Sequence, residues 1–139
     1  MRAMLMVATL APHPAAAQPN VATQSAVYVE RPGPDASRQL EPANRLSRGD
    51  RVVTVVNWYR VGGEGSFVIT NPLPRALAYQ GSAWDDQQVS VDGGRTWGRL
   101  GTLQIGGRLA TPEDVTHVRW RIPASGASRG EIAYSGIVR

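Results

Sequence analysis

Hydrophobic and polar residues alternate along several short runs of this sequence, and a period of two residues is the pattern of β-strands. Residues 115–122 show it most cleanly. One predicted face carries Val118, Trp120 and Ile122, and the opposite face carries His117, Arg119 and Arg121. Residues 51–61 are dense in β-branched and aromatic residues and place apolar groups on both faces, which predicts a central strand covered on both sides. A last strand is predicted at residues 131–138, with Ile132, Tyr134 and Val138 directed inward.

Glycine and proline separate the remaining runs at short intervals and leave no helix long enough to connect parallel strands. Shorter strands are predicted at residues 26–30, as an edge strand, and at residues 67–70, 77–80, 88–91 and 96–100. The last two flank Asp92, Gly93 and Gly94, whose glycines permit the positive φ angles of a tight hairpin. Residues 111–114 predict one helical turn with Thr111 as its N-cap. The whole pattern predicts an all-β fold, an antiparallel Greek-key sandwich of about seven or eight strands.

Composition excludes some functions. A chain of 139 residues, 42% of them hydrophobic, has the size of one domain with one core. All 15 basic residues are arginine, yet the formal net charge of +4 is too small to predict nucleic-acid binding. Cysteine is absent, which excludes disulfides, thiolate catalysis and cysteine-based metal sites in this sequence.

The first residues have the features of a secretory leader. Arg2 supplies a positive start, residues 3–11 are apolar, and three alanines at residues 15–17 form a small-residue cleavage site. A buried N-terminal helix is the alternative, but Pro12 and Pro14 would break it.

Three segments are therefore expected. They are a signal peptide at residues 1–17, a flexible N-terminal segment at residues 18–26 and one β-sandwich domain at residues 27–139. The apolar run of the leader is far shorter than the ~20 residues that span a bilayer, so no membrane span is expected after cleavage. The mature protein would be periplasmic or secreted.

Several motifs follow one another in a characteristic order along the domain. Gly49 and Asp50 open the long strand, Asn71-Pro72-Leu73-Pro74 ends the next one, and Leu77-Ala78-Tyr79 is followed by Gly81-Ser82. In these motifs the chain, from about residue 27 to residue 139, resembles the conserved-repeat domain of bacterial surface and exported proteins, known as domain of unknown function eleven. The resemblance implies an immunoglobulin-like sandwich that serves as a spacer, stalk or adhesive module without catalytic residues. Asn71 stands where the family usually has Asp, and the tandem copies common in the family are missing.

Residues 90–97, Ser-Val-Asp-Gly-Gly-Arg-Thr-Trp, match the Asp-box pattern Ser-x-Asp-x-Gly-x-Thr-Trp, which is similar to hairpins of sialidase-like propellers and other β-proteins. The pattern describes a hairpin cap, in which the Asp92 carboxylate can accept backbone amides across the turn while Trp97 packs beneath it. We interpret Ser90, Asp92, Gly94, Thr96 and Trp97 as a structural hairpin. Glycan contact is the alternative.

Candidate catalytic and metal-binding residues are few. His117 is the one histidine that follows the predicted leader, and its strand position points it outward beside Arg119 and Arg121. No serine stands in a nucleophile-elbow context, and no second histidine stands at metal-ligand spacing. Asp85 and Asp86 lack the surrounding pattern of a Ca²⁺ loop, and we interpret them as a solvated loop. We predict no enzymatic activity, no metal site and no cofactor.

A basic surface is the remaining candidate contact for a ligand or partner. It would form if the hairpin pairs with the strand at residues 115–122, and it comprises Arg95, Arg99, His117, Arg119 and Arg121, with Trp84 nearby. Arginine and tryptophan side chains can hold an acidic glycan by charge-assisted hydrogen bonds and stacking. A solvated arginine face is the alternative, and Trp58 and Trp120 are expected in the core.

Two functions are therefore expected. The first is a non-enzymatic, exported structural or protein-interaction module of the bacterial cell envelope, which could pair with an envelope protein through an edge strand. The second is a carbohydrate-binding module that holds an acidic surface polymer with the hairpin and the arginine face. Neither involves nucleic acid.

Overall fold

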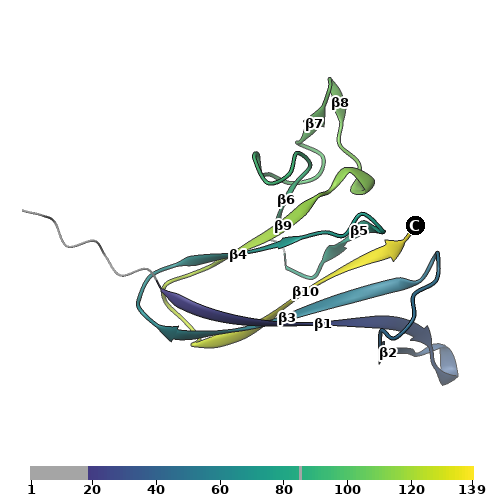
Figure 1. Ribbon diagram of the computed structural model, residues 1–139, viewed down its shortest axis with the longest axis horizontal. Helices are drawn as coiled ribbons and strands as arrows, with labels where there is room; N and C mark the ends of the chain where they lie inside the picture. Colours follow the sequence, from purple (N-terminus) through teal and green to yellow (C-terminus); the bar gives the residue numbers. More distant parts are fainter. Residues whose placement is uncertain (1–18, 85) are drawn as a thin grey trace, which may run out of the picture.

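The structure is a computed structural model that describes residues 19–84 and 86–139. The predicted signal peptide and Asp85 lie outside the described residues. In the described part the chain forms ten strands, which assemble into two antiparallel sheets packed face to face and one small hairpin (Figure 1). The expected all-β sandwich is confirmed, with more strands than the seven or eight that the pattern predicts.

The larger sheet has five strands and the smaller sheet has three. In spatial order, the larger sheet contains β2 (Arg38–Pro42), β1 (Asn20–Pro32), β3 (Arg51–Gly62), β10 (Arg129–Val138) and β5 (Leu77–Ser82). The smaller sheet contains β4 (Phe67–Pro72), β9 (His117–Ile122) and β6 (Gln88–Ser90). The hairpin of β7 (Gln104–Ile105) and β8 (Arg108–Leu109) projects from these two layers at the top of Figure 1. Between β3 and β6 each successive strand lies in the opposite sheet, which gives the non-sequential strand order of a Greek-key sandwich.

The core lies between the sheets, where the inward side chains of β3, β9 and β10 meet. Val56, Val118, Trp120 and Ile132 are at most 1% exposed. On the outward face of β9, Arg121 is exposed. The alternation predicted for residues 115–122 is therefore confirmed, because one face of this strand meets the other sheet and the other face meets solvent.

The strand β3 is central in the larger sheet, as predicted, but only one of its faces is covered. Val52 and Trp58 are buried between the sheets, whereas Tyr59 and Val61 are 49% and 61% exposed. The prediction that both faces are covered is wrong, because these residues meet no second layer within the described part of the chain. Valine and tyrosine favour extended backbone even where one face is open to solvent, so their density alone does not indicate burial.

The N-terminal part of the described chain forms a strand where a flexible segment was expected. Residues 20–26, expected to be flexible, form the first half of β1, where Thr23 pairs with Trp58 in the ladder to β3. The strand is not an edge strand either, since its second half pairs with β2. A polar strand without alternation can be held by backbone pairing with a strong neighbour, which a sequence pattern does not reveal.

The predicted helical turn is present as η2 (Pro112–Asp114), a 3₁₀ turn. The backbone N–H of Thr111 donates to the Asp114 carboxylate at 2.8 Å, which forms the expected capping box. Arg108 donates to both oxygens of that carboxylate, at 2.8 and 3.0 Å. The Arg108 guanidinium, together with the Thr111 amide, holds the pKa of Asp114 well below its usual range. A second turn, η1 (Pro34–Ala36), connects β1 to β2.

Candidate functional site

The turn at residues 90–97 is closed by its own side chains. The Asp92 carboxylate accepts hydrogen bonds from the backbone N–H groups of Arg95 and Thr96, at 3.1 and 2.9 Å, and from the Thr96 hydroxyl at 2.6 Å. The Ser90 hydroxyl donates to the same carboxylate at 2.8 Å. These bonds, above all the one from the Thr96 hydroxyl, hold the pKa of Asp92 well below its usual range. The turn is thus built around a carboxylate, as a hairpin cap requires.

The glycine of this turn brings the backbone close to the tryptophan. Gly94 has a φ of +90°, a conformation that favours glycine, and its N–H donates to the Ser90 hydroxyl at 2.9 Å. The indole N–H of Trp97 donates back to the Gly94 carbonyl at 3.0 Å. Ser90 itself is fully buried. The hydrogen bonds of Gly94, Ser90 and Trp97 therefore stabilise the conformation of the turn.

The return strand of the predicted hairpin is not formed. β6 ends at Ser90, and the chain rejoins it at Gly98, which exchanges backbone hydrogen bonds with Val89 at 3.1 and 2.8 Å. The prediction of a strand at residues 96–100 is wrong, because the Asp92 carboxylate engages the backbone N–H groups at residues 95 and 96, and the chain turns again after Gly98.

The predicted arginine face is assembled only in part. Arg119 lies over Trp97, with its guanidinium carbon 4.4 Å from the ring centroid, and its Nε donates to Gln88 at 2.9 Å. His117 packs edge-on against the same indole, with 6.4 Å between the ring centroids. Arg119, Trp97 and His117 therefore form one cluster in which the arginine is already engaged by protein groups.

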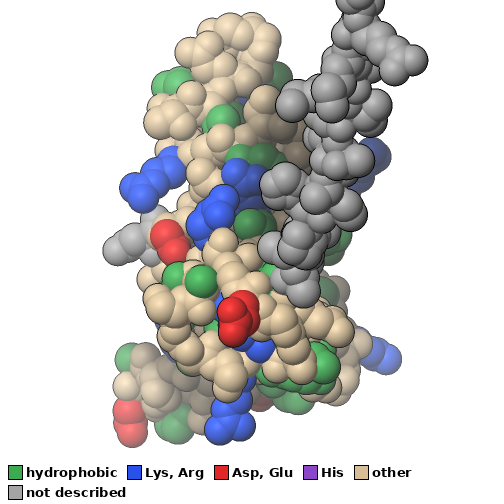
Figure 2. Space-filling model, turned by 90° about the vertical axis from the view of Figure 1, so that its left-hand side faces the viewer, with side chains coloured by type: hydrophobic (Ala, Val, Ile, Leu, Met, Phe, Trp, Pro, Cys, Tyr) green, Lys and Arg blue, Asp and Glu red, His purple; other side chains and the backbone are tan. Residues whose placement is uncertain are grey.

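The other predicted contact residues do not join this cluster. Arg95 and Arg99 are exposed at the turn, and within the described residues their side chains make no hydrogen bond or ion pair. Arg121 lines a hollow with Arg119 and Asp86, and also borders a separate cavity that contains Trp84. Figure 2 shows one end of the molecule, where basic side chains are spread over the surface rather than gathered in one patch.

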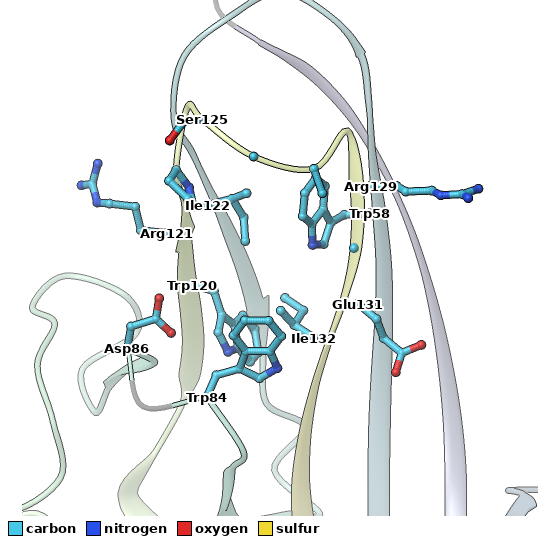
Figure 3. A pocket seen from close by; sticks show the side chains of 14 residues that line it. Trp58, Trp84, Asp86, Trp120, Arg121, Ile122, Ser125, Arg129, Glu131 and Ile132 are labelled. Carbon is cyan, nitrogen blue, oxygen red and sulfur yellow. The ribbon is translucent and has the colours of Figure 1, made fainter.

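A cavity of about 280 Å³ lies between the two sheets beside β9 and β10 (Figure 3). Its walls are mainly apolar and include three of the four tryptophans of the chain, Trp58, Trp84 and Trp120. Pro123, Ser125, Gly126 and Ala127, from the loop between the two strands, also line it. Sequence analysis places Trp58 and Trp120 in the core, and both are buried there, at 6% and 1% exposure. It does not predict the cavity, because the indoles come together only through the pairing and packing of distant strands.

A second opening, of about 650 Å³ and with a more polar lining, lies between the start of β1 and β4. The contributing residues are Pro19, Asn20, Val21 and Thr23 on one side, Ser66, Phe67, Val68, Ile69, Thr70 and Asn71 on the other, and Arg121. We call this opening the β1–β4 groove. Both strands border it with an edge that pairs with no other described strand at these positions.

Within residues 19–84 and 86–139, no three His, Cys, Asp or Glu side chains come together as metal ligands. None of the helical segments described is long and apolar enough to cross a membrane.

Comparison with known proteins adds no relative. No family model, no curated protein and no solved structure matches the chain. The resemblance to the conserved-repeat domain therefore stays a prediction, and functional interpretation depends on the geometry of the turn, the cavity and the groove.

Proposed function

We propose that this chain is a non-enzymatic, exported interaction module of the bacterial cell envelope that takes up an extended segment of a partner protein in the β1–β4 groove. The segment would add a fourth strand to the smaller sheet at the edge of β4. Strand addition of this kind derives its affinity from backbone hydrogen bonds along an exposed edge. Support comes chiefly from one observation, the direction of the unpaired backbone groups of β4.

Backbone hydrogen bonds alternate along an antiparallel strand, so each residue turns its N–H and C=O either toward its neighbour or away from it. Val89 exchanges both of its backbone hydrogen bonds with Gly98. The N–H and C=O of Val89 therefore point away from its partner on β9, Val118. Val118 must then direct its own groups to Asn71 on β4. By the same alternation, Val68 and Thr70 direct their N–H and C=O groups away from β9, toward the free edge.

The facing edge of β1 has matching properties. The Val27 carbonyl accepts from the Ala43 amide at 3.1 Å, on the side of β2. The same alternation turns the backbone of Ser25 and Thr23 to that side, beyond the end of β2. Their side chains share a face with the buried Val56 and Trp58, yet they are exposed. An added strand beside β4 would cover this inward but open face of β1.

Other edges of the sheets are protected in ways that β4 is not. Edge strand β2 carries Arg38, Glu41 and Pro42, and charges and proline are common means of preventing strand addition. Edge strand β6 is bridged by Gly98. Edge strand β5 is uncharged like β4, but its pairing with β10 has a register shift between Ser135 and Gly136, and such irregularities also disfavour strand addition. β4 carries no charge, and its one proline, Pro72, stands at its end. The part of β4 that precedes Pro72 is therefore the edge best suited to a partner strand.

The alternative proposal is binding of an acidic glycan. Arg119 and Arg121 share the outer face of the smaller sheet, opposite Thr70 and Val68. The engagement of Arg119 by Trp97 and Gln88 favours strand addition over this alternative. Salt-sensitive binding of an anionic polysaccharide, lost in the double variant Arg119→Ala with Arg121→Ala, would instead favour the glycan.

The test is site-specific photo-crosslinking in cells that produce the protein, with the photoreactive residue at Val68, whose side chain is 42% exposed. We expect a defined crosslinked partner. Thr70→Pro should abolish it, because proline removes an outward N–H and leaves the bonds of Ile69 and Asn71 to β9 intact. Thr70→Val, which keeps the N–H, is the matched control and should retain the partner.

A probe at Tyr59, on the outer face of the larger sheet, controls for location and should not give the same product. The proposal fails if the probe at Val68 yields no defined product, or if Thr70→Pro yields the product as efficiently as Thr70→Val. Circular dichroism of both variants would verify that the sandwich is retained.

A further inference from the structure

The charge of the β1–β4 groove comes from a single side chain. Of the described residues that line the groove, Arg121 alone is charged. It projects from the outer face of β9, where its register partner on β4 is Val68. Its side chain is exposed, and Figure 3 shows it pointing away from the tryptophans of the neighbouring cavity. A segment that enters the groove therefore meets one positive charge.

This positive charge is not neutralised within the described part of the chain. None of the ion pairs formed there involves Arg121. Asp86 borders the same outer hollow as Arg121 but forms no ion pair with it. The other arginine on this face, Arg119, donates to Gln88 and lies over an indole ring. Arg121 is thus the cation on the outer face of the smaller sheet that a new strand could engage.

An added strand would bring its outward side chains within reach of Arg121. Neighbouring strands lie about 4.8 Å apart, so the added strand would run about twice that distance from β9, with β4 between them. Residues directly opposite each other in a pair of strands share a face, so the residue opposite Val68 would also point outward. Valine is short, and an extended arginine and a glutamate can meet above it. An acid at this position would gain an ion pair, whereas a base would be repelled.

The inner side of the groove favours the opposite character. Val21, Phe67 and Ile69 line it, and all three belong to the hydrophobic core or pack against it. Side chains of the added strand that alternate with its outward ones would face these residues. Apolar side chains would bury surface there, while a charged one would lose hydration without an ionic partner. The groove therefore favours a strand with one apolar and one acidic face.

A second copy of this chain fits the edge less well. Two antiparallel β4 strands would place Arg119 and Arg121 of both copies on one continuous outer face. β4 carries no acidic residue that could offset these charges. Like charges on neighbouring strands are destabilising. The positive charge beside β4 therefore favours a different, acidic segment over self-association.

We propose that the segment accepted beside β4 is an amphipathic strand whose apolar residues face Val21 and Ile69 and whose outward acidic residue pairs with Arg121. This inference rests on the proposed function, because the ion pair forms only if a strand is added at this edge. It makes Arg121 a determinant of specificity. An exposed ion pair contributes little affinity, but a wrongly charged partner is rejected by repulsion.

The test measures the binding of peptides with blocked ends and an uncharged fluorescent label to the purified protein, by fluorescence anisotropy at low ionic strength. The probe has nine residues, in which threonine alternates with valine and glutamate replaces the central threonine. It should bind roughly 2- to 5-fold more tightly than the same peptide with a central glutamine, the range for one exposed ion pair. A central lysine should bind more weakly than glutamine. Moving the glutamate to the valine face should also weaken binding.

Three variants assign this preference to one side chain. Arg121→Gln should make the glutamate and glutamine peptides bind equally. Arg121→Glu should reverse the preference, so that the lysine peptide binds more tightly than the glutamate peptide. Arg99→Gln is the matched control, because it removes one positive charge from an exposed position that does not line the groove, and it should keep the preference for glutamate.

The acidic partner is refuted if none of the peptides binds, if the glutamate and glutamine peptides bind equally to the unmodified protein, or if Arg121→Gln keeps the preference. Strand addition has its own readout, since Thr70→Pro should abolish binding of both peptides and Thr70→Val should retain it. Equal binding to these two variants would refute strand addition, and with it this inference. Loss of binding in Thr70→Pro without any charge preference would refute the acidic residue alone.

Discussion

Gly130 of β10 lies directly opposite Trp58 of β3, and a Cβ atom at residue 130 would stand 2.6 Å from Cζ2 of the indole. The indole therefore lies against the backbone of β10, in space that any other residue at position 130 would occupy. Trp58 also contacts Phe67 edge-on, with 5.3 Å between the ring centroids. One glycine thus allows a large aromatic ring to serve both the core and a wall of the cavity.

We expect Gly130→Ala to lower the free energy of unfolding by about 1–3 kcal/mol, because the added methyl group forces Trp58 out of its position. Urea unfolding followed by tryptophan fluorescence would measure the change. Gly62→Ala is the control, since a Cβ at residue 62 meets no atom within 4 Å, and it should be close to neutral. Equal stabilities of the two variants would contradict the close packing of Trp58 on residue 130.

Asp92 links the stability of the turn to pH. Its hydrogen bonds lower its pKa in the folded protein, so the ionised carboxylate stabilises the fold above the unfolded pKa of about 3.9, and this contribution is lost as pH falls through the folded pKa. Asp92→Asn should therefore lower Tm most at neutral pH and progressively less below about pH 4. Thermal melts in a pH series would measure this. Glu41→Gln, at an exposed position of β2, is the control and should not show this pH-dependent loss of Tm. A loss of Tm in Asp92→Asn that is the same at every pH would contradict the prediction.

Tyr79 and Gln87 form a polar contact inside the core, in which the Tyr79 hydroxyl donates to the Gln87 side-chain oxygen. Burial raises the pKa of Tyr79 to about 12, so the phenol remains a donor at neutral pH. Tyr79→Phe should lower the free energy of unfolding by about 1–3 kcal/mol, because it leaves a buried acceptor unpaired. Urea unfolding would measure it beside Tyr59→Phe, whose exposed ring should change stability little. A similar loss in both variants would argue against the buried contact.

Arg60 connects two loops at one end of the sandwich. Its guanidinium donates to the carbonyls of Gly65 and Pro123, both at 2.7 Å, and lies 4.7 Å from the ring centroid of Phe67. Lysine cannot reproduce this planar, two-sided contact. We expect Arg60→Lys to lower the free energy of unfolding by about 1–3 kcal/mol.

Hydrogen exchange gives this prediction a local readout, because residues 123–128 should exchange faster in Arg60→Lys. Arg48→Lys, at an exposed position whose side chain makes no hydrogen bond within the described residues, is the control. Unchanged exchange in the loop would contradict the role assigned to Arg60.

Local chemistry explains which features could be predicted from the sequence. The strand at residues 115–122 alternates because one face is buried, and its side-chain types reveal this directly. The capping box of Thr111 and Asp114 and the bonds of Asp92 to its own turn join residues three or four positions apart. Such contacts depend on short-range backbone geometry and need no knowledge of the fold.

Other features required the positions of distant strands. The polar first half of β1 is held by its ladder to β3, and nothing in its own pattern indicates a strand. Arg95 and Arg99 were expected beside Arg119 on one face, but the return strand that would align them is replaced by a single bridge at Gly98.

The sequence by itself determined the all-β class, the inward residues of β9 and β10, and the hydrogen bonds that close the two local turns. The tertiary structure decided where the sheets end, and therefore which strand edges remain free and where three tryptophans enclose a cavity. The physical reason is that alternation reports which side of a strand is buried, whereas strand order and register report what lies against it. The free edge of β4 and the cavity beside Trp120 both arise where a neighbouring strand is missing.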